Sequence, residues 1–431
     1  MQFLKKIIVT ILTWEARLVL LRYKPKIIAV TGSVGKTSTK DAIFAALASS
    51  LHIRKSEKSF NSDIGVPLAI LGLDNGWSDP FKWASNIARG LWLVVVTHQY
   101  PEWLVLEVGA DRPNDIKNVA RWLRPDITVI TAIPEVPVHV EYFDSPAAVL
   151  REKRWLAEYL KPGGRLIING DDVRMSDLKT DFRGITVTYG MEAEIDDICA
   201  SHDKILYEHN LPVGFTFRAN YAGSSVPVSI YGSLGTPRMY SALAALAVAS
   251  VVEVDLVRAS QALSQWSPPP GRMRILPGMH GSLIIDDTYN SSPAAALAAL
   301  DTLALIETTG RKVAVLGDML ELGRYSTDAH KEVGSRAAAC ADALVTVGFR
   351  ARVMGEAALD AGMPEINIRE YEQGEVGRAG IEILRELKEG DIILVKGSQS
   401  MRMERAVFEL LAEPMHAPEF LVRQESEWGR R

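Results

Sequence analysis

The chain of 431 residues is long enough for two or three domains. Hydrophobic residues make up 47% of it and charged residues 23%, as in a globular protein with large cores. A net charge of −5 argues against a general nucleic-acid binder, and two isolated cysteines, Cys199 and Cys340, are too few for a disulfide framework or a zinc site. This composition fits a reducing, cytoplasmic setting.

The first 25 residues predict a basic amphipathic helix. Its apolar positions are Phe3, Ile7, Ile11, Trp14, Leu18 and Leu21, and its polar side carries Lys5, Lys6, Thr10, Thr13 and Arg17. The longest apolar stretch, Ile7 to Leu12, is too short to span a bilayer. Such a helix can lie peripherally at the inner face of a membrane, through residues 1–22, or pack on the domain beside it.

Residues 26–38 read as a buried strand, a glycine turn and the start of a helix. Gly32 and Gly35 let the backbone curl so that its N–H groups point at an anion, and the helix adds its positive dipole end. Lys36 would reach the terminal phosphates of a nucleotide, and the Thr37 hydroxyl would contact Mg²⁺. The pattern is the short G-x-x-G-K-T form of a P-loop, and an ordinary βα turn is the alternative.

An aromatic-rich stretch lies between the P-loop and the next long strand. It contains Trp77, Phe81, Trp83, Trp92 and Trp103. With the N-terminal helix it could form an apolar surface that faces lipid or a partner, and a buried hairpin is the alternative interpretation.

Two further strands end in residues suited to ligand chemistry. The strand over residues 103–108 contains Glu107, a carboxylate at the carboxyl end of a strand and therefore a candidate Mg²⁺ ligand. A strand over residues 127–131 is followed by His139. Lys153 lies in a charged helix that, taken alone, would be solvated surface.

The pattern changes twice in the second half. Residues 186–232 form short alternating segments, which predict an antiparallel, strand-rich portion. Pro268 to Gly271 is the clearest boundary, and beyond it strands alternate with helices, as in a parallel sheet covered on both faces. The prediction is an α/β protein: an N-terminal helix (1–25), a P-loop domain with a mostly parallel sheet (26–270) and a Rossmann-like α/β domain (271–431).

An ordered series of motifs resembles those of the Mur ligase family, the ATP-dependent amide-bond-forming ligases of cell-wall synthesis. Besides the P-loop, the motifs are Asn61 to Pro67, Glu107 to Gly109, His139 to Phe143, Gly271-Arg272, Asp286 to Asn290, Val315 to Gly323 with His330, and Lys396 to Ser398. The closest resemblance is to the subtype that adds D-alanyl-D-alanine to a UDP-linked muramoyl tripeptide. That subtype rests mostly on Leu316 to Gly323 and on the Asp-Asp-x-Tyr-Asn run.

The resemblance implies that ATP, with Mg²⁺, phosphorylates a substrate carboxylate, and that an amine such as D-Ala-D-Ala then attacks the acyl phosphate. It implies phosphate contacts at Gly32, Ser33, Gly35, Lys36, Thr37 and Ser38, and nucleotide contacts at Asp287, Tyr289 and Asn290. It implies metal contacts at Thr37, Glu107, His139 and Lys153, catalytic roles for Lys36, His139, Lys153 and Arg272, and substrate contacts at Asp318, Glu321 and Lys396. In many members the lysine matching Lys153 is carbamoylated by CO₂.

The chain departs from the family pattern in two places. Gly235 to Ser241 replaces a His-Asn motif that contacts adenine, so the adenine contacts must differ. Only about 25 residues precede the P-loop strand, where the subtype has a UDP-sugar-binding domain. Either another protein supplies that recognition or the acceptor is not UDP-linked, and a membrane-bound acceptor would suit the basic start.

Two other functions stay open from the sequence. One is a ligase for another peptide-like conjugate, such as a polyglutamate. The other is a non-catalytic nucleotide-binding scaffold at the membrane, against which the intact Lys36, Thr37, Glu107 and His139 argue. We expect a monomer without a nucleic-acid partner.

Overall fold

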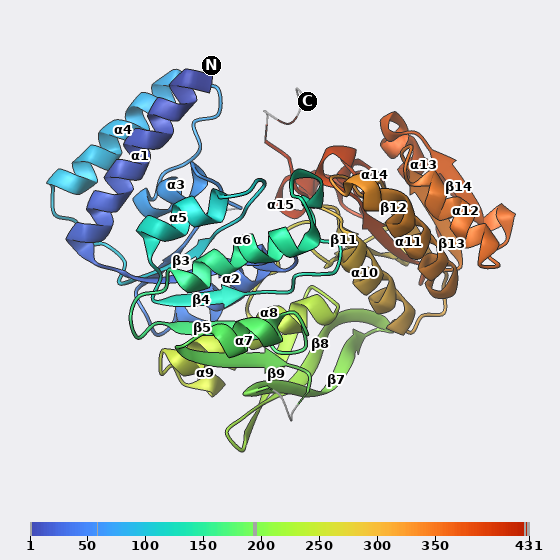
Figure 1. The fold of residues 1–431 in the computed structure, drawn as a ribbon. Coiled ribbons are helices and arrows are strands. Elements are labelled where there is room, and N and C mark those ends of the chain that lie inside the picture. The colour runs from blue at the N-terminus through green and yellow to red at the C-terminus, as the bar shows by residue number, and fades with distance from the viewer. Residues whose placement is uncertain (1, 58, 193–195, 426–427, 429–431) are drawn as a thin grey trace.

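The computed structural model describes residues 2–57, 59–192, 196–425 and 428, with side chains from residue 6 onward. The side chains of Phe3 and Lys5, two positions of the predicted amphipathic helix, therefore lie outside the described residues. The chain forms two sheets that lie next to each other, each with its own covering helices (Figure 1).

The first sheet has nine strands in the order β2-β3-β1-β4-β5-β6-β7-β8-β9. Its strands are β1 (Lys26–Thr31), β2 (Ile53–Lys55), β3 (Trp103–Glu107), β4 (Ile127–Ile130), β5 (Arg165–Asn169), β6 (Ile185–Gly190), β7 (Ile198–Glu208), β8 (Leu211–Tyr221) and β9 (Ser224–Tyr231). Neighbouring strands from β2 to β7 pair in parallel, and β7, β8 and β9 pair antiparallel. The predicted mostly parallel sheet with a strand-rich portion is confirmed.

Helices cover both faces of the first sheet because its central strands are apolar on both sides. They are α1 (Gln2–Tyr23), α2 (Lys36–Leu47), α3 (Gly65–Leu71), α4 (Pro80–Val95), α5 (Asp115–Leu123), α6 (Pro146–Glu158), α7 (Met175–Asp181), α8 (Thr236–Val251) and α9 (Leu256–Ser264). On β1, Ile28 and Val30 pack against α2, α8 and α9, whereas Ile27 and Ala29 pack against α1, α3 and α5. Successive strand residues point to opposite faces, so one strand serves both cores.

The second sheet has six strands in the order β10-β11-β15-β12-β13-β14, parallel except for β10 against β11. The strands are β10 (Arg274–Pro277), β11 (Leu283–Asp287), β12 (Lys312–Gly317), β13 (Ala343–Val347), β14 (Ile368–Tyr371) and β15 (Ile392–Lys396). Helices α10 (Pro293–Leu305), α11 (Ser326–Cys340) and α12 (Arg352–Asp360) cover one face, and α13 (Val376–Glu386), α14 (Glu404–Leu410) and α15 (Ala417–Phe420) cover the other.

Short 3₁₀ helices complete the chain. They are η1 (Val140–Tyr142), η2 (Met279–Gly281), η3 (Gly323–Tyr325), η4 (Glu365–Asn367), η5 (Gln373–Glu375), η6 (Gln399–Met401) and η7 (Pro414–His416). No helix among the described residues is long and apolar enough to cross a membrane.

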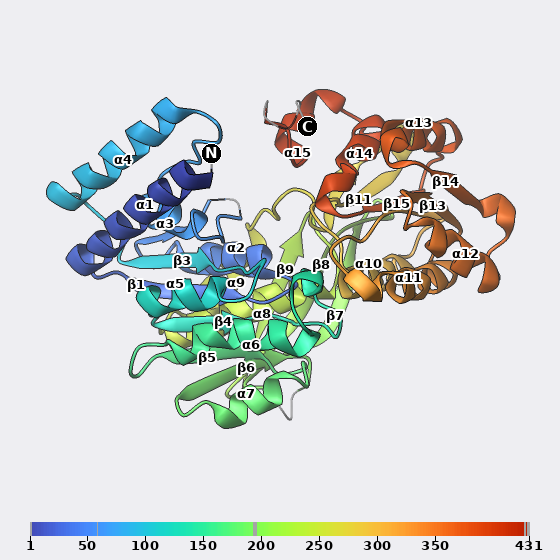
Figure 2. The same ribbon diagram turned by 45° about the horizontal axis from the view of Figure 1, so that its top comes forward.

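The two sheets bring polar strand ends to one place. Glu107 ends β3 in the first sheet, and Asp287 and Lys396 are register partners at the ends of β11 and β15 in the second. All three line one cavity of 390 Å³ between the units. The α1 and α4 helices lie side by side at the edge of the molecule away from the second sheet, as Figures 1 and 2 agree.

Candidate active site

The P-loop turn depends on two glycines. Gly32 has φ +142° and Gly35 has φ +86°, which L side chains rarely adopt, and a Cβ on Gly32 would lie 1.9 Å from Thr131 Oγ1. The first amide groups of any helix have no acceptor within the helix. Helix α2 begins at Lys36, and no side chain caps these amides. The positive end of α2 and the adjoining turn line the 390 Å³ cavity, which suits a phosphate.

The backbone and the side chain of Ser33 play different roles in this turn. Its backbone N–H donates to the Ala132 carbonyl at 3.0 Å, so that amide holds the loop in place. Its hydroxyl is buried without a hydrogen-bond partner and lines the cavity. The side chain, rather than the amide, is the group left for a ligand.

Thr37 and Glu107 form the centre of the site. The Thr37 hydroxyl donates to Glu107 Oε2 at 2.8 Å, and Asn61 Nδ2 donates to Glu107 Oε1 at 3.0 Å. Hydroxyl and carboxylate oxygens are ligands that Mg²⁺ prefers. No group of three or more acidic, histidine or cysteine side chains among the described residues could hold a metal. The pair therefore fits an ion whose remaining ligands are phosphate oxygens and water.

Lys36 lies beside this pair. Burial lowers the pKa of its ammonium group, while the Glu107 carboxylate opposes that shift and Arg272 adds to it. The balance makes the position a strong binding place for further negative charge, such as that of phosphate oxygens.

Residues of the second unit reach into the first. Arg272 Nη2 donates to Thr37 Oγ1 at 2.9 Å, and its guanidinium lies over the Tyr289 ring at 4.0 Å. Tyr289 OH donates to Ser59 Oγ at 2.8 Å. These contacts join the predicted phosphate and nucleotide residues across the cavity.

Asp287 and Lys396 form an ion pair on the far wall of the cavity. Lys396 Nζ lies 2.5 Å from Asp287 Oδ2 and also donates to the Asn290 carbonyl at 3.0 Å. Lys396 is buried, so each charge compensates the other where water is scarce. A predicted substrate residue and a predicted nucleotide residue are thus tied together.

His139 links the two units on the other side. It has φ +65°, and its Nδ1 lies 2.7 Å from Glu321 Oε2, while its Nε2 lies 3.7 Å from Asp111 Oδ1. The His139 imidazole beside it lowers the pKa of Glu321. His139 and Asp111 line both the 390 Å³ cavity and an adjoining cavity of 660 Å³ that Glu321 also lines.

Lys153 is buried on α6, only 3% exposed. Burial, followed by the charge of Lys36, lowers its pKa to about 7. Its neighbour Glu152 is buried too, because its carboxylate accepts from the amides of Ile116 at 2.8 Å and Lys117 at 3.1 Å. The charged helix is therefore not a solvated surface at these two positions.

Asp318 lies apart from the other predicted residues. Its buried carboxylate accepts from the Ala351 amide at 2.7 Å and lies 3.7 Å from Arg350. It does not line the 390 Å³ or 660 Å³ cavity, so its substrate role stays a prediction.

Arg238, to which the sequence analysis assigned no role, lies on α8 and lines the main cavity. Its Nε donates to Ser233 Oγ at 3.1 Å, its Nη2 donates to the Arg272 carbonyl, and its Nη1 is buried without a partner. Burial, followed by the charge of Arg272, lowers its pKa to about 9. Its signal was an arginine inside the stretch that departs from the family pattern.

A second group that the sequence missed lines a cavity of 180 Å³ beside Gly35. Asn169, Tyr189 and Tyr240 contribute to its wall. Tyr240 OH donates to Asp171 Oδ2 at 2.6 Å, which fixes the ring. The cavity adjoins the P-loop and is a candidate place for the base of a nucleotide.

Two family models match the chain: Mur ligase middle domain over residues 30–249, and Mur ligase, glutamate ligase domain, over residues 271–399. The UDP-N-acetylmuramoyl-tripeptide–D-alanyl-D-alanine ligase of Bacillus subtilis is 28% identical over 400 residues, covering 90% of this chain and 77% of that protein. The ligase of the same name from Escherichia coli is 27% identical over 384 residues, covering 89% and 76%.

Solved structures share the fold. The MurF ligase of Thermotoga maritima, solved with ADP, has a TM-score of 0.75 at 23% identity and covers 93% of this chain and 82% of that chain. The folylpolyglutamate synthase of Mycobacterium tuberculosis, also solved with ADP, has a TM-score of 0.62 at 16% identity, with 93% and 94% covered.

Proposed function

The chain belongs to the Mur ligase family of ATP-dependent peptide ligases, and we propose that it makes an amide bond of a peptidoglycan precursor. The proposed amine is D-Ala-D-Ala, and the proposed carboxylate belongs to a muramoyl peptide. The observation that carries the proposal is the single cavity at which the P-loop meets Arg272, Asp287 and Lys396 of the second unit. The names of the relatives at 27–28% identity support the choice of amine.

In this reaction the γ-phosphoryl group of ATP moves to the carboxylate, and the amine attacks the acyl phosphate, forming the amide and releasing phosphate. Lys36 and Arg272 place positive charge beside the transferring group. Thr37 and Glu107 would hold Mg²⁺, which supplies charge neutralisation when bound. The hydroxyls of Ser33 and Ser38 and the turn glycines complete the proposed phosphate site.

Other predicted residues take proposed roles around this centre. His139 and Lys153 would serve a second Mg²⁺, Lys153 after reaction of its neutral amine with CO₂ to give a carbamate and a proton. Asp287, Tyr289 and Asn290 would contact the nucleotide. Asp318, Glu321 and Lys396 would orient the amine, Lys396 through its ion pair with Asp287.

We divide the chain into an N-terminal helix (1–25), an ATP-binding domain (26–270) and a C-terminal domain (271–431). Closure of the two larger domains is expected, since groups from both must meet one γ-phosphate. The proposed place of action is the cytoplasm, with a peripheral contact at the inner face of the membrane.

The test is phosphate release from ATP and Mg²⁺ in the presence of D-Ala-D-Ala and a UDP-muramoyl tripeptide, for wild type and Lys36→Ala. We expect phosphate release that requires both substrates and that is lost in Lys36→Ala. If ATP binds but this pair gives no turnover, the substrate assignment is wrong, and lipid-linked muropeptides and glutamate with a polyglutamate acceptor are tested next. ATP binding without turnover on any pair would favour the scaffold.

A further inference from the structure

Helices α1 and α4 run side by side and form one unit. Tyr23 OH lies 3.1 Å from the carbonyl oxygens of both Leu93 and Val96, and Arg22 donates to the Val95 carbonyl at 3.2 Å. Toward the sheet, α1 buries Leu12, Ala16 and Val19 in the core beneath it. The pair is therefore anchored on its inner side and free to present its outer side.

Three apolar residues of the predicted α1 stripe, spaced seven positions apart, lie outside the core. Ile7, Trp14 and Leu21 are exposed, Leu21 by 70%. On α4, Phe81 is 86% exposed and Val95 71% exposed, and Leu91 and Trp92 are exposed as well. We call these seven residues the α1–α4 apolar face: Ile7, Trp14, Leu21, Phe81, Leu91, Trp92 and Val95.

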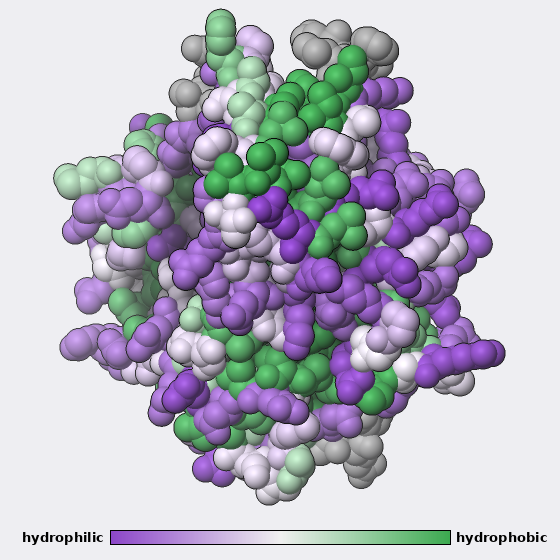
Figure 3. Space-filling model, turned by 90° about the vertical axis from the view of Figure 1, so that its left-hand side faces the viewer, coloured by the Kyte–Doolittle hydropathy of each residue, from purple (hydrophilic) through white to green (hydrophobic). Residues whose placement is uncertain are grey.

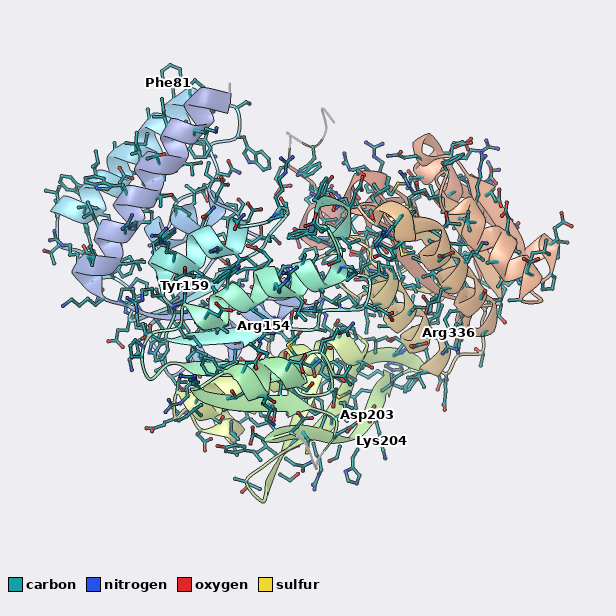
Figure 4. The ribbon with its side chains drawn as sticks, in the orientation of Figure 1. Phe81, Arg154, Tyr159, Asp203, Lys204 and Arg336 are labelled. Atoms are coloured by element: carbon teal, nitrogen blue, oxygen red, sulfur yellow. The ribbon has the colours of Figure 1, made fainter. Side chains whose placement is uncertain are left out.

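The pictures place this face at an extremity of the molecule. Figure 3 looks onto the left-hand side of Figure 1, and hydrophobic side chains gather in its upper half, over the region of α1 and α4. Figure 4 shows Phe81 at the outer end of the pair, far from Lys204 on β7. A flat partner can approach this end without meeting the second unit.

The exposed charged side chains on the two helices themselves are positive, whereas Asp79, which caps the start of α4 next to Phe81, is an exposed carboxylate. Lys6, Arg17 and Arg22 on α1 and Lys82 and Arg89 on α4 are exposed. The sequences of α1 and α4 hold one acidic residue, Glu15. It is fully buried, and a Cβ on Gly90 would lie 2.1 Å from its Oε2. The face is thus cationic on a chain whose net charge is −5.

The combination of exposed apolar and basic side chains indicates what kind of partner this face binds. Exposed aliphatic and aromatic groups with basic neighbours suit the interface of a bilayer, where tryptophan rings lie at headgroup level and cations meet anionic headgroups. A second copy docked by the same face would bring like charges together, which opposes such a dimer. We propose that the α1–α4 apolar face docks on the surface of bilayers that contain anionic phospholipids. The proposal does not depend on which amide the enzyme makes.

The test is co-sedimentation of the full chain with vesicles of phosphatidylcholine alone and of phosphatidylcholine mixed with phosphatidylglycerol, at low and high salt. We expect binding to the mixed vesicles that weakens at high salt and is much weaker on phosphatidylcholine alone. Phe81→Asp should weaken binding at least about tenfold, because the phenylalanine that the bilayer would bury is lost. The double variant Lys82→Glu with Arg89→Glu should weaken it about fivefold or more per residue.

Matched controls keep the test specific. Phe349→Asp changes a phenylalanine that is 75% exposed in the second unit, and Lys204→Glu with Arg258→Glu reverses two exposed charges elsewhere. Circular dichroism and ATP binding report the fold of every variant. The proposal is wrong if vesicles do not bind, if both vesicle types bind equally, or if Phe81→Asp behaves as Phe349→Asp does. It is also wrong if Phe81→Asp only converts an oligomer to a monomer, since the face would then join copies of the chain.

Discussion

The Arg272 guanidinium donates a hydrogen bond to the Thr37 hydroxyl at 2.9 Å across 235 positions of sequence. Thr37 is also the donor to Glu107, so one hydroxyl joins the second unit to the proposed metal ligand. Arg272 is held over the Tyr289 ring, which restricts the guanidinium to this place. The position of the second unit relative to the first therefore affects the geometry of the proposed metal site.

We expect Arg272→Ala to lower kcat by about a hundredfold to a thousandfold, because a cation aimed at the transferring phosphoryl group is lost. Arg272→Lys keeps the charge but not the flat stack on Tyr289, and should recover only part of the rate. Steady-state kinetics of phosphate release measure both variants, with Tm as the control for folding. Wild-type turnover in Arg272→Ala would contradict the role.

Glu107→Gln tests the metal site. The carboxylate charge is removed while the side chain keeps its shape, so the Mg²⁺ concentration needed for half-maximal activity should rise at least about tenfold. Titration of activity with Mg²⁺ measures this change, and Glu158→Gln, an exposed glutamate at the end of α6, is the matched control. An unchanged Mg²⁺ dependence would remove Glu107 from the ligand set.

The sequence allowed correct predictions where the position of a functional residue follows from the local backbone structure. The P-loop glycines, Thr37 and Glu107 could be predicted because parallel strands place their carboxyl ends at one edge. Helix α4 also had a signal that was missed: Asp79 precedes Pro80, and its carboxylate accepts from the Phe81 amide at 2.9 Å, as an N-cap does.

The remaining features depend on the tertiary arrangement. Glu152 and Lys153 lie in a helix of surface composition, yet both are buried, and the Glu152 carboxylate accepts from amides at the start of α5. Arg238 lines the cavity because its helix, α8, packs against α2 of the first unit and contacts α10 of the second. Neither contact could be predicted from residue spacing within one segment of the sequence.

Glu15 should make stability depend on pH. Burial raises its pKa to about 7 from 4.5, so the folded state holds a proton that the unfolded state releases above 4.5. Its contribution is therefore fully present below about pH 4.5 and is lost as the pH rises through 7. Glu15→Gln, which cannot ionise, should raise Tm above pH 7 and leave it nearly unchanged near pH 4.5.

Thermal unfolding across this pH range checks the Glu15 prediction, with Glu158→Gln as the exposed control. Equal effects of the two variants at every pH would mean that the carboxylate between α1 and Gly90 is solvated in solution. A stabilised Glu15→Gln that still binds mixed vesicles would separate the stability of the helix pair from its surface.

Lys153 makes a prediction about CO₂. A pKa near 7 leaves a large share of its amine neutral at neutral pH, and only the neutral amine attacks CO₂. Removal of dissolved CO₂ should lower activity, and added bicarbonate should restore it, with more modification at higher pH. Intact-protein mass spectrometry under native conditions should show one added CO₂, absent in Lys153→Arg.

The Lys153 variants separate a carbamate from a plain cation. Lys153→Glu places a carboxylate near the same position and should retain more activity than Lys153→Arg, which keeps the charge. The lowered pKa also means that the unfolded state binds the proton more readily than the folded state, so this lysine costs stability as the pH falls from about 10.5 toward 7. An active Lys153→Arg enzyme that ignores bicarbonate would show that the buried amine acts as a cation next to Lys36, and the second metal site would then lack its ligand.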